Sequence, residues 1–169
     1  MTLLATLHDL HPEAYPPFPA RPETRTTARA ILLDAEGHVA LMHVGRKGYH
    51  KLPGGGLEGD ETIEQGLVRE LMEETGCTAE VLQPLGTVEE YRARGGFLQI
   101  SHAFLACVTG PKGTPSFDVF EQADNFSIKW LPLAEALNIL SQDSATTDYE
   151  WSFINRRETA ILRAALSAI

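Results

Sequence analysis

The segment from Gly54 to Gly76 constrains the fold of this 169-residue chain more than any other part of the sequence. It holds seven acidic residues and one basic residue, Arg69, so its formal charge is −6 in a chain whose net charge is −9. Like charges three or four residues apart destabilise an isolated helix. The segment therefore forms either a helix face exposed to water, as most runs of charged residues do, or a site for a cationic ligand that relieves the repulsion.

The order of residues in this segment predicts one helix behind a tight turn. Residues 53–56, Pro-Gly-Gly-Gly, form a glycine-rich turn. Glu61 to Thr75 contain no proline, and Gly76 follows them at a position where glycine commonly ends a helix in the left-handed conformation. We therefore expect a helix over residues 61–75.

Three carboxylates of this predicted helix share one side. Successive helical residues turn by about 100°, so Glu70, Glu73 and Glu74 project within about 100° of one another. The adjoining apolar arc, which would anchor the helix in a core, consists of Ile63, Leu67, Val68, Leu71 and Met72. A divalent cation would convert the repulsion into coordination, and carboxylate oxygens suit Mg²⁺, with Mn²⁺ as a substitute.

A basic loop precedes the glycine turn. It contains Arg46, Lys47, His50 and Lys51. Cations beside an acidic metal site suit a polyphosphate, because they bind non-bridging oxygens while the metal bridges others. We therefore expect Arg46, Lys47 and Lys51 to bind substrate. The alternative is a solvated loop that only balances the acidic helix.

Hydrophobic patterning predicts strands on both sides of this helix and further helices after them. Apolar runs predict strands over residues 26–33, 39–44, 81–91, 97–108 and 126–131, the first two joined as a hairpin. Pro132, at a first helical position, predicts a short helix through Leu140. Apolar residues at helical spacing from Phe153 to Ile169 predict a closing helix.

The distribution of proline predicts where the domain begins. Five of the ten prolines lie in the first 22 residues, and each fixes φ and removes a backbone donor. We therefore expect an extended proline-rich arm over residues 1–24. The length of the remainder, residues 25–169, suits a single domain.

Charge and cysteine content narrow the class of protein. An acidic chain lacks the basic surface that nucleic acids and anionic membranes require, so neither is an expected partner. The apolar stretch over residues 3–7 is too short for a signal peptide or a membrane span. Cys77 and Cys107 form no CxxC pair, which fits a reducing, cytoplasmic location. Monomer and homodimer both stay open.

The acidic segment resembles a known motif, the Nudix box. That pattern is Gly-x5-Glu-x7-Arg-Glu-aliphatic-x-Glu-Glu-x-Gly-aliphatic, and the residues that fill it here are Gly55, Glu61, Arg69, Glu70, Leu71, Glu73, Glu74, Gly76 and Cys77. The resemblance extends over about residues 25–140. Two positions depart from it: Cys77 is a small apolar substitute, and His50 stands where many members carry tryptophan.

The resemblance implies an α/β fold, a Nudix-type α/β/α sandwich with a mixed β-sheet. It also implies a Mg²⁺-dependent pyrophosphohydrolase that cleaves a nucleoside diphosphate linked to another group. Carried over to this chain, the principal metal ligands are Glu70 and Glu74. Glu73 is a further ligand, and the backbone carbonyl of Gly54 or Gly55 completes the set.

Other motif residues take structural roles in the resemblance. Glu61 and Arg69 would pair to hold the loop-helix-loop in shape, and Gly55 and Gly76 would shape its turns. The general base varies in this family. The first choice here is Glu121, in the acidic loop from residue 118 to 124, and the second choice is Glu89 or Glu90, with a glutamate of the box as the remaining option.

The sequence leaves the substrate open, because specificity in such a fold lies in loops. The candidates are a nucleoside triphosphate, including an oxidised one, ADP-ribose, a dinucleoside polyphosphate and a sugar nucleotide. A catalytically silent nucleotide-sensing module is the alternative from another class of protein. An isoprenoid diphosphate isomerase is a weaker alternative, since neither Cys77 nor Cys107 has a spacing that recommends it as a catalytic acid.

Overall fold

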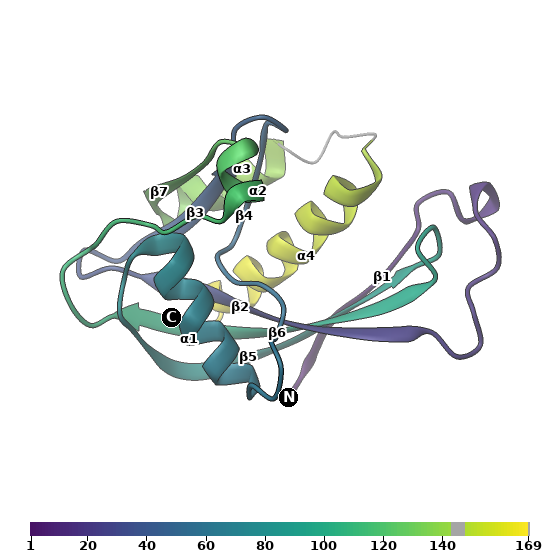
Figure 1. The fold of residues 1–169 in the computed structure, drawn as a ribbon, viewed down its shortest axis with the longest axis horizontal. Helices are drawn as coiled ribbons and strands as arrows, with labels where there is room; N and C mark the ends of the chain where they lie inside the picture. Colours follow the sequence, from purple (N-terminus) through teal and green to yellow (C-terminus); the bar gives the residue numbers. More distant parts are fainter. Residues whose placement is uncertain (143–147, 169) are drawn as a thin grey trace.

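A curved, mixed β-sheet forms the centre of the protein in a computed structural model that describes residues 1–142 and 148–168 (Figure 1). Its strands are β1 (Leu3–His8), β2 (Glu23–Leu33), β3 (His38–Val44), β4 (Tyr49–Lys51), β5 (Ala79–Arg92), β6 (Phe97–Val108) and β7 (Phe126–Pro132). Their order is β1-β5-β6-β2-β3-β4, and β7 pairs with β3. The β1/β5 and β2/β6 pairs are parallel, and the other pairs are antiparallel.

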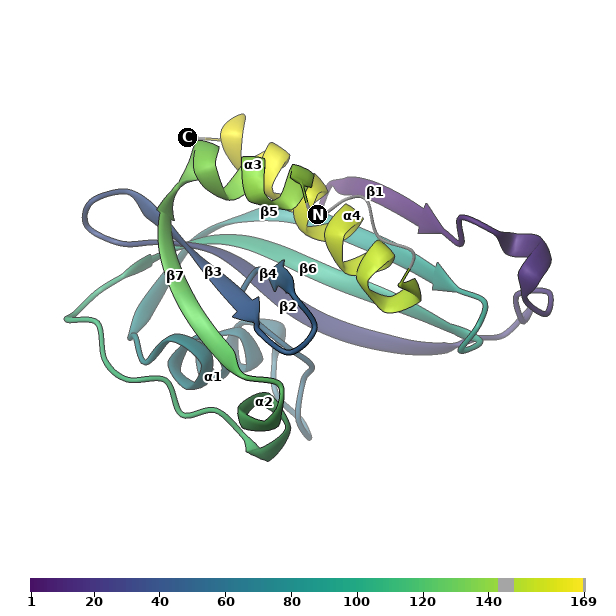
Figure 2. The same ribbon diagram turned by 90° about the horizontal axis from the view of Figure 1, so that it is seen from above.

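Helices cover both faces of this sheet. Helix α1 (Ile63–Thr75) lies on one face, and α3 (Leu133–Gln142) and α4 (Tyr149–Leu166) lie on the other (Figure 2). The short α2 (Val119–Ala123) lies on the α1 side beside β7, and a 3-10 turn spans Pro12–Ala14. This arrangement confirms the predicted α/β/α sandwich with a mixed sheet.

Strand alternation divides the core into two clusters. On β2, Ala28, Ala30 and Leu32 pack with Leu67 and Leu71 of α1. Ile31, between them in sequence, belongs to the opposite cluster, which includes Ile161 and Leu162 of α4. Because successive strand residues point to opposite faces, one strand serves both layers. Residues 27–32 of β2 are therefore buried between the two helical layers.

The amino-terminal arm requires a correction. Residues 3–8, predicted as part of an extended arm over 1–24, form β1, which pairs in parallel with β5 from Leu3↔Thr87 to His8↔Tyr91. A short apolar run carries no sign of a parallel partner some eighty residues away, so sequence reasoning missed it. The proline-rich stretch that follows β1 leads to β2.

Several predicted elements differ in detail. Strands β2 and β3 are consecutive and antiparallel, but their pairing is at Leu33↔Val39, and the long partner of β2 is β6. Pro132 ends β7 instead of starting α3. The closing helix is present as α4, and Ile169 lies outside the described residues. Within residues 1–142 and 148–168, no helix combines the length and the apolar character needed to cross a membrane.

The separation of β2 from β3 positions the glycine turn. The turn pairs with the edge of β2 along which β3 does not pair. Ala28 N–H donates to Gly55 O (2.9 Å), and Ala30 N–H donates to Pro53 O (3.1 Å). Thr27 and Gly56 add a bridge. The turn is thereby fixed to the centre of the sheet, directly before α1 begins.

Candidate active site

Helix α1 begins and ends at residues with the expected capping chemistry. Thr62 Oγ1 accepts from Gln65 N–H (3.2 Å), and Gln65 Oε1 accepts from Thr62 N–H (2.9 Å), which together form a capping box. Gly76, with φ of 69°, ends the helix and donates its N–H to Met72 O. The predicted helix is confirmed, and it starts two residues later than predicted because Thr62 occupies the cap.

At Gly54 and Gly55 the glycine turn lies against β2 and α1 with no room for side chains. Gly54 has a φ of 126°, and a Cβ there would clash with Ala28 O. A Cβ on Gly55 would overlap the carboxylate of Glu70. The glycines therefore let the backbone approach the acidic side of α1 directly.

Glu74 is the most enclosed of the three carboxylates, with an exposure of 1%. Its Oε2 accepts from Gly54 N–H (2.6 Å), and its Oε1 accepts from Lys51 Nζ (2.7 Å). Charge-assisted bonds of this kind hold the side chain in one place. Glu74 thus joins α1, the glycine turn and β4.

Arg69 donates hydrogen bonds to three carboxylates of this region. Its Nε donates to Glu61 Oε1 (2.9 Å), and its Nη1 donates to Glu70 Oε1 (3.0 Å) and to Glu73 Oε2 (2.9 Å). The bonds from Arg69 hold the pKa of Glu61 below its ordinary value. Burial raises the pKa of Glu70, and the neighbouring Glu74 carboxylate raises it further. One guanidinium therefore serves three carboxylates, which leaves the site with surplus negative charge.

These groups line one cavity of about 370 Å³. The predicted site residues that line this cavity include Gly54, Gly55, Lys51, Glu70, Glu73, Glu74 and Glu121. We call this cavity the acidic cleft. It brings together carboxylates, a backbone turn and an amine from four separate parts of the chain.

Glu121 reaches the acidic cleft from α2, a short helix that sequence reasoning did not predict. The preceding loop is fastened to α1, because Ser116 N–H donates to Glu73 O (2.7 Å). Asp118 and Glu121 form a capping box. Burial raises the pKa of Glu121; the Asp118 N–H opposes that rise, and the Glu74 carboxylate adds to it.

Two of the three predicted basic residues lie outside the acidic cleft. Lys47 Nζ pairs with Asp124 (2.9 Å), and the Arg46 N–H donates to Asp124 O. Lys47 also lines a second cavity, of about 390 Å³, with Tyr49 and Trp151. We call it the aromatic cavity. Lys51 alone of the three predicted cations lines the acidic cleft.

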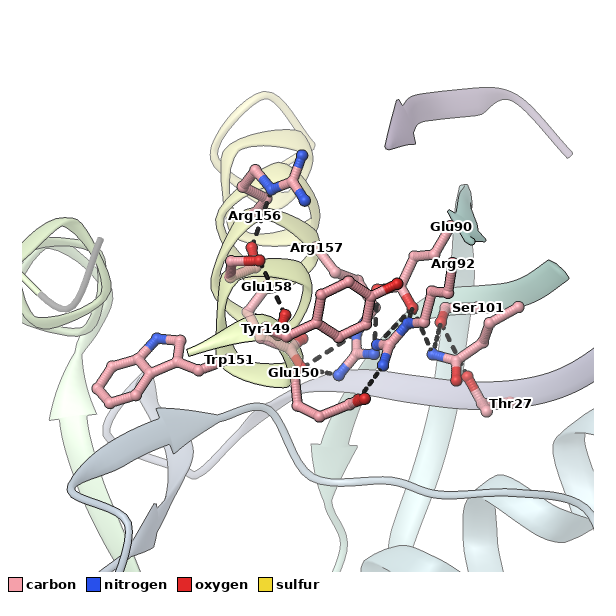
Figure 3. A network of polar contacts seen from close by, with 12 residues as sticks. Thr27, Glu90, Arg92, Ser101, Tyr149, Glu150, Trp151, Arg156, Arg157 and Glu158 are labelled. Atoms are coloured by element: carbon pink, nitrogen blue, oxygen red, sulfur yellow. Dashed lines mark hydrogen bonds and ion pairs between the residues drawn. The ribbon is translucent and has the colours of Figure 1, made fainter. Parts of the chain in front are cut away.

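The second-choice bases lie elsewhere. Glu90 is fully buried under α4, where it accepts from Arg157 Nη1 (3.2 Å) and Arg92 Nη2 (2.8 Å), as Figure 3 shows. Arg157 also donates to Glu158 (2.6 Å), and Arg92 pairs with Glu150. We call this set the α4 network. On the opposite side of β5, Glu89 accepts from Tyr91 Oη (3.1 Å).

Two features of the structure escaped the sequence reasoning. Arg29, from the middle of β2, lines the acidic cleft, and a lone arginine within an apolar run gave no functional signal. Asp34, Glu36 and His38 gather at the β2–β3 turn. The Asp34 carboxylate accepts from the backbone N–H groups of Glu36 and His38 and from Lys112 Nζ. Turn formation therefore accounts for this cluster.

Comparison with protein families gives a match over most of the chain. A model of the NUDIX domain matches residues 23–152. "Nudix hydrolase 21, chloroplastic" from Arabidopsis thaliana is 32% identical over 123 residues, which cover 72% of this chain and 59% of that protein. "Nudix hydrolase 7" from the same organism is 28% identical over 69% of this chain and 42% of its own length. The chain thus spans about half the length of these curated relatives.

Solved structures share the fold at low sequence identity. The NUDIX domain of Shewanella oneidensis NrtR, solved in complex with ADP ribose, has a TM-score of 0.60 and 22% identity, covering 94% of this chain and 96% of that one. The MutT protein from Methanosarcina mazei Go1 has a TM-score of 0.56 and 20% identity, covering 82% and 95%. At these identities the likeness concerns the fold.

Proposed function

The chain belongs to the Nudix family, and on that premise we propose that it hydrolyses the phosphoric anhydride of a nucleoside diphosphate linked to another group, with a divalent cation as cofactor. The observation that carries the proposal is the convergence of Glu70, Glu73 and Glu74 on one cavity beside the glycine turn. This surplus of carboxylates next to a backbone turn suits a cation and the phosphates that it binds.

The residues present fit such a cation. Carboxylate oxygens of Glu70, Glu73 and Glu74 and the carbonyl of Gly54 or Gly55 form a set of oxygen donors that suits Mg²⁺, with Mn²⁺ as a substitute. The Glu70 carboxylate lies directly against Gly55, at the position that a Cβ on Gly55 would occupy. When bound, the cation polarises phosphoryl oxygens and lowers the pKa of water.

Side chains of the acidic cleft supply the remaining functions. Lys51, held beside Glu74 at 2.7 Å, places one positive charge in the cavity wall for a phosphoryl oxygen. Glu121 accepts the proton of the attacking water. Its raised pKa suits this role, because a general base works best with a pKa close to the working pH. Glu61 and Arg69 hold the turn and helix together.

The aromatic cavity offers a place for the nucleoside. Tyr49 and Trp151 lie with ring centroids 4.9 Å apart, and both line the cavity. Tyr49 and Lys51 are two residues apart on β4, a separation of about 7 Å along a strand. We propose that the base binds at Tyr49 and Trp151 and the phosphates at Lys51, so that β4 contacts both parts of the nucleotide. The partner that we propose is a small nucleotide.

A substrate panel tests the proposal. The full chain is incubated with 8-oxo-dGTP, ADP-ribose, diadenosine tetraphosphate and UDP-glucose, each with Mg²⁺, Mn²⁺ or EDTA, and products are separated by anion-exchange chromatography. We expect cleavage of an anhydride bond in at least one substrate and complete loss with EDTA. Nucleotide binding without any product would contradict the proposal and favour the sensing module. The cytoplasmic location and the choice between monomer and homodimer stay predictions.

A further inference from the structure

Arg29 differs from the other buried arginines of the protein. Its exposure is 8%, and neither Nε nor Nη1 has a hydrogen-bond partner among the described residues. By contrast, Arg157 donates to Glu158 and Glu90, and Arg92 donates to Glu90. Buried guanidinium donors without partners are unfavourable, because they have lost their hydrogen bonds to water.

The position of Arg29 explains what this group faces. Gly54 lies directly over it, since a Cβ at Gly54 would be 3.0 Å from Arg29 Cα. The side chain lines the acidic cleft with Glu70, Glu74 and Lys51. The charged groups that act on it are Glu70 and Glu74 of α1 and Arg157 and Glu158 of α4.

The charges around Arg29 favour an anion once the cleft is occupied. Burial lowers the pKa of Arg29, and the neighbouring Arg157 lowers it further. Glu158 accepts from Arg157 through Oε1, and its Oε2 has no hydrogen-bond partner among the described residues. Glu70 and Glu74 are the carboxylates assigned above to the cation. With those two engaged, a substrate anion in the acidic cleft would supply an acceptor that Nε and Nη1 of Arg29 lack among the described residues.

We propose that Arg29 is a phosphate-binding residue whose guanidinium donates to non-bridging oxygens of the substrate's diphosphate. A guanidinium presents its donors in a planar fork that matches two phosphate oxygens, so geometry as well as charge is selective. The assignment rests on the proposed function, because it takes the diphosphate to lie in the acidic cleft. It adds a substrate contact from β2 to those from α1 and β4.

The test compares three variants of the full chain. Arg29→Met removes the charge but keeps an extended apolar side chain, and Arg29→Lys keeps the charge without the fork. Arg25→Met, on the same strand but exposed and paired with Glu23, is the matched control. Binding of α,β-methyleneadenosine 5′-diphosphate with Mg²⁺ is measured by calorimetry, and thermal unfolding is measured without ligand.

For Arg29→Met we expect a Kd at least about 10-fold above wild type, since a charge-assisted bidentate contact is lost. We expect a smaller rise for Arg29→Lys and no change for Arg25→Met. The Tm of Arg29→Met without ligand should equal or exceed that of wild type, because an unpaired buried charge has been removed. A purely structural arginine would behave in the opposite way, with a lower Tm and an unchanged Kd.

The outcomes separate this assignment from the proposed function. Wild-type cleavage and binding with unchanged Kd in both Arg29 variants would overturn the Arg29 assignment alone. Absence of both binding and cleavage in wild type would overturn the proposed function and the assignment together. If Arg29→Met fails to fold, Arg29 is required for folding, and the test then depends on Arg29→Lys. A wild-type Kd in Arg29→Lys would overturn the assignment.

Discussion

Two groups of buried charges, the α4 network and the acidic cleft, differ in how completely their members are paired. In the α4 network each member forms an ion pair, although Glu158 Oε2 has no partner among the described residues. Arg157 and Arg92 share Glu90, Arg157 also pairs with Glu158, and Arg92 also pairs with Glu150 (Figure 3). In the acidic cleft, three carboxylates of α1 and Glu121 face Lys51 and the guanidinium of Arg69, while Arg29 has two donors without partners among the described residues.

The difference separates charges that stabilise the fold from charges that we expect to bind a ligand. Paired buried ions fix one element to another, and removing either partner is costly because the other stays buried and uncompensated. Crowded carboxylates and an unpaired guanidinium cost stability in the free protein. Such costs are concentrated at functional sites, where a ligand offsets them.

The α4 network gives the largest expected change in stability. Arg157→Met leaves Glu90 and Glu158 with fewer partners, so we expect the free energy of unfolding to fall by about 3–5 kcal/mol. Thermal unfolding monitored by circular dichroism measures the loss, and Arg163→Met, exposed on the same helix, is the control. Equal Tm values for the two variants would remove the contrast between the two regions.

The acidic cleft should respond in activity instead of stability. Glu70→Gln removes one proposed metal ligand and relieves repulsion with Glu74, so we expect kcat to fall at least about 100-fold with an unchanged or higher Tm. The measurement is turnover at saturating nucleotide and Mg²⁺. Glu64→Gln, on the exposed side of α1, should keep wild-type turnover. Wild-type kcat in Glu70→Gln would show that Glu70 is not a ligand.

The pH dependence of stability sharpens the same point with a smaller effect. Because burial and Glu74 raise the pKa of Glu70, the folded protein binds this proton more tightly than the unfolded chain does. The associated stability is present at low pH and is lost as pH rises through the raised pKa. In EDTA, Glu70→Gln should therefore have a higher Tm than wild type at about pH 8. The difference should shrink toward zero at about pH 4.5. A constant or inverted difference would refute this sign.

Local signals explain how much of the fold the sequence predicted. Helix α1 is specified by short-range features: the cap at Thr62, the apolar arc that includes Leu67 and Leu71, and Gly76. The strands β5 and β6 are likewise adjacent in the chain and joined by a short turn. β1 and the long β2/β6 pair depend on partners far along the chain, and no local pattern encodes a parallel partner.

The candidate site divides in the same way. The positions of Glu70, Glu73 and Glu74 follow from helical periodicity, so the sequence predicted that they share one side. The basic loop divides between two cavities. Lys47 pairs with Asp124 and lines the aromatic cavity, whereas Lys51 pairs with Glu74 and lines the acidic cleft. Arg29 lines the acidic cleft beside the glycine turn, which only the three-dimensional structure shows.

Direct measurement of cation binding tests the central claim that the acidic cleft holds a divalent cation. Mn²⁺ is titrated into wild type, Glu70→Gln and Glu64→Gln, and free Mn²⁺ is followed by electron paramagnetic resonance. We predict saturable binding to wild type and to Glu64→Gln, and a Kd at least about 10-fold higher for Glu70→Gln. Identical titration curves for Glu70→Gln and Glu64→Gln would contradict the account.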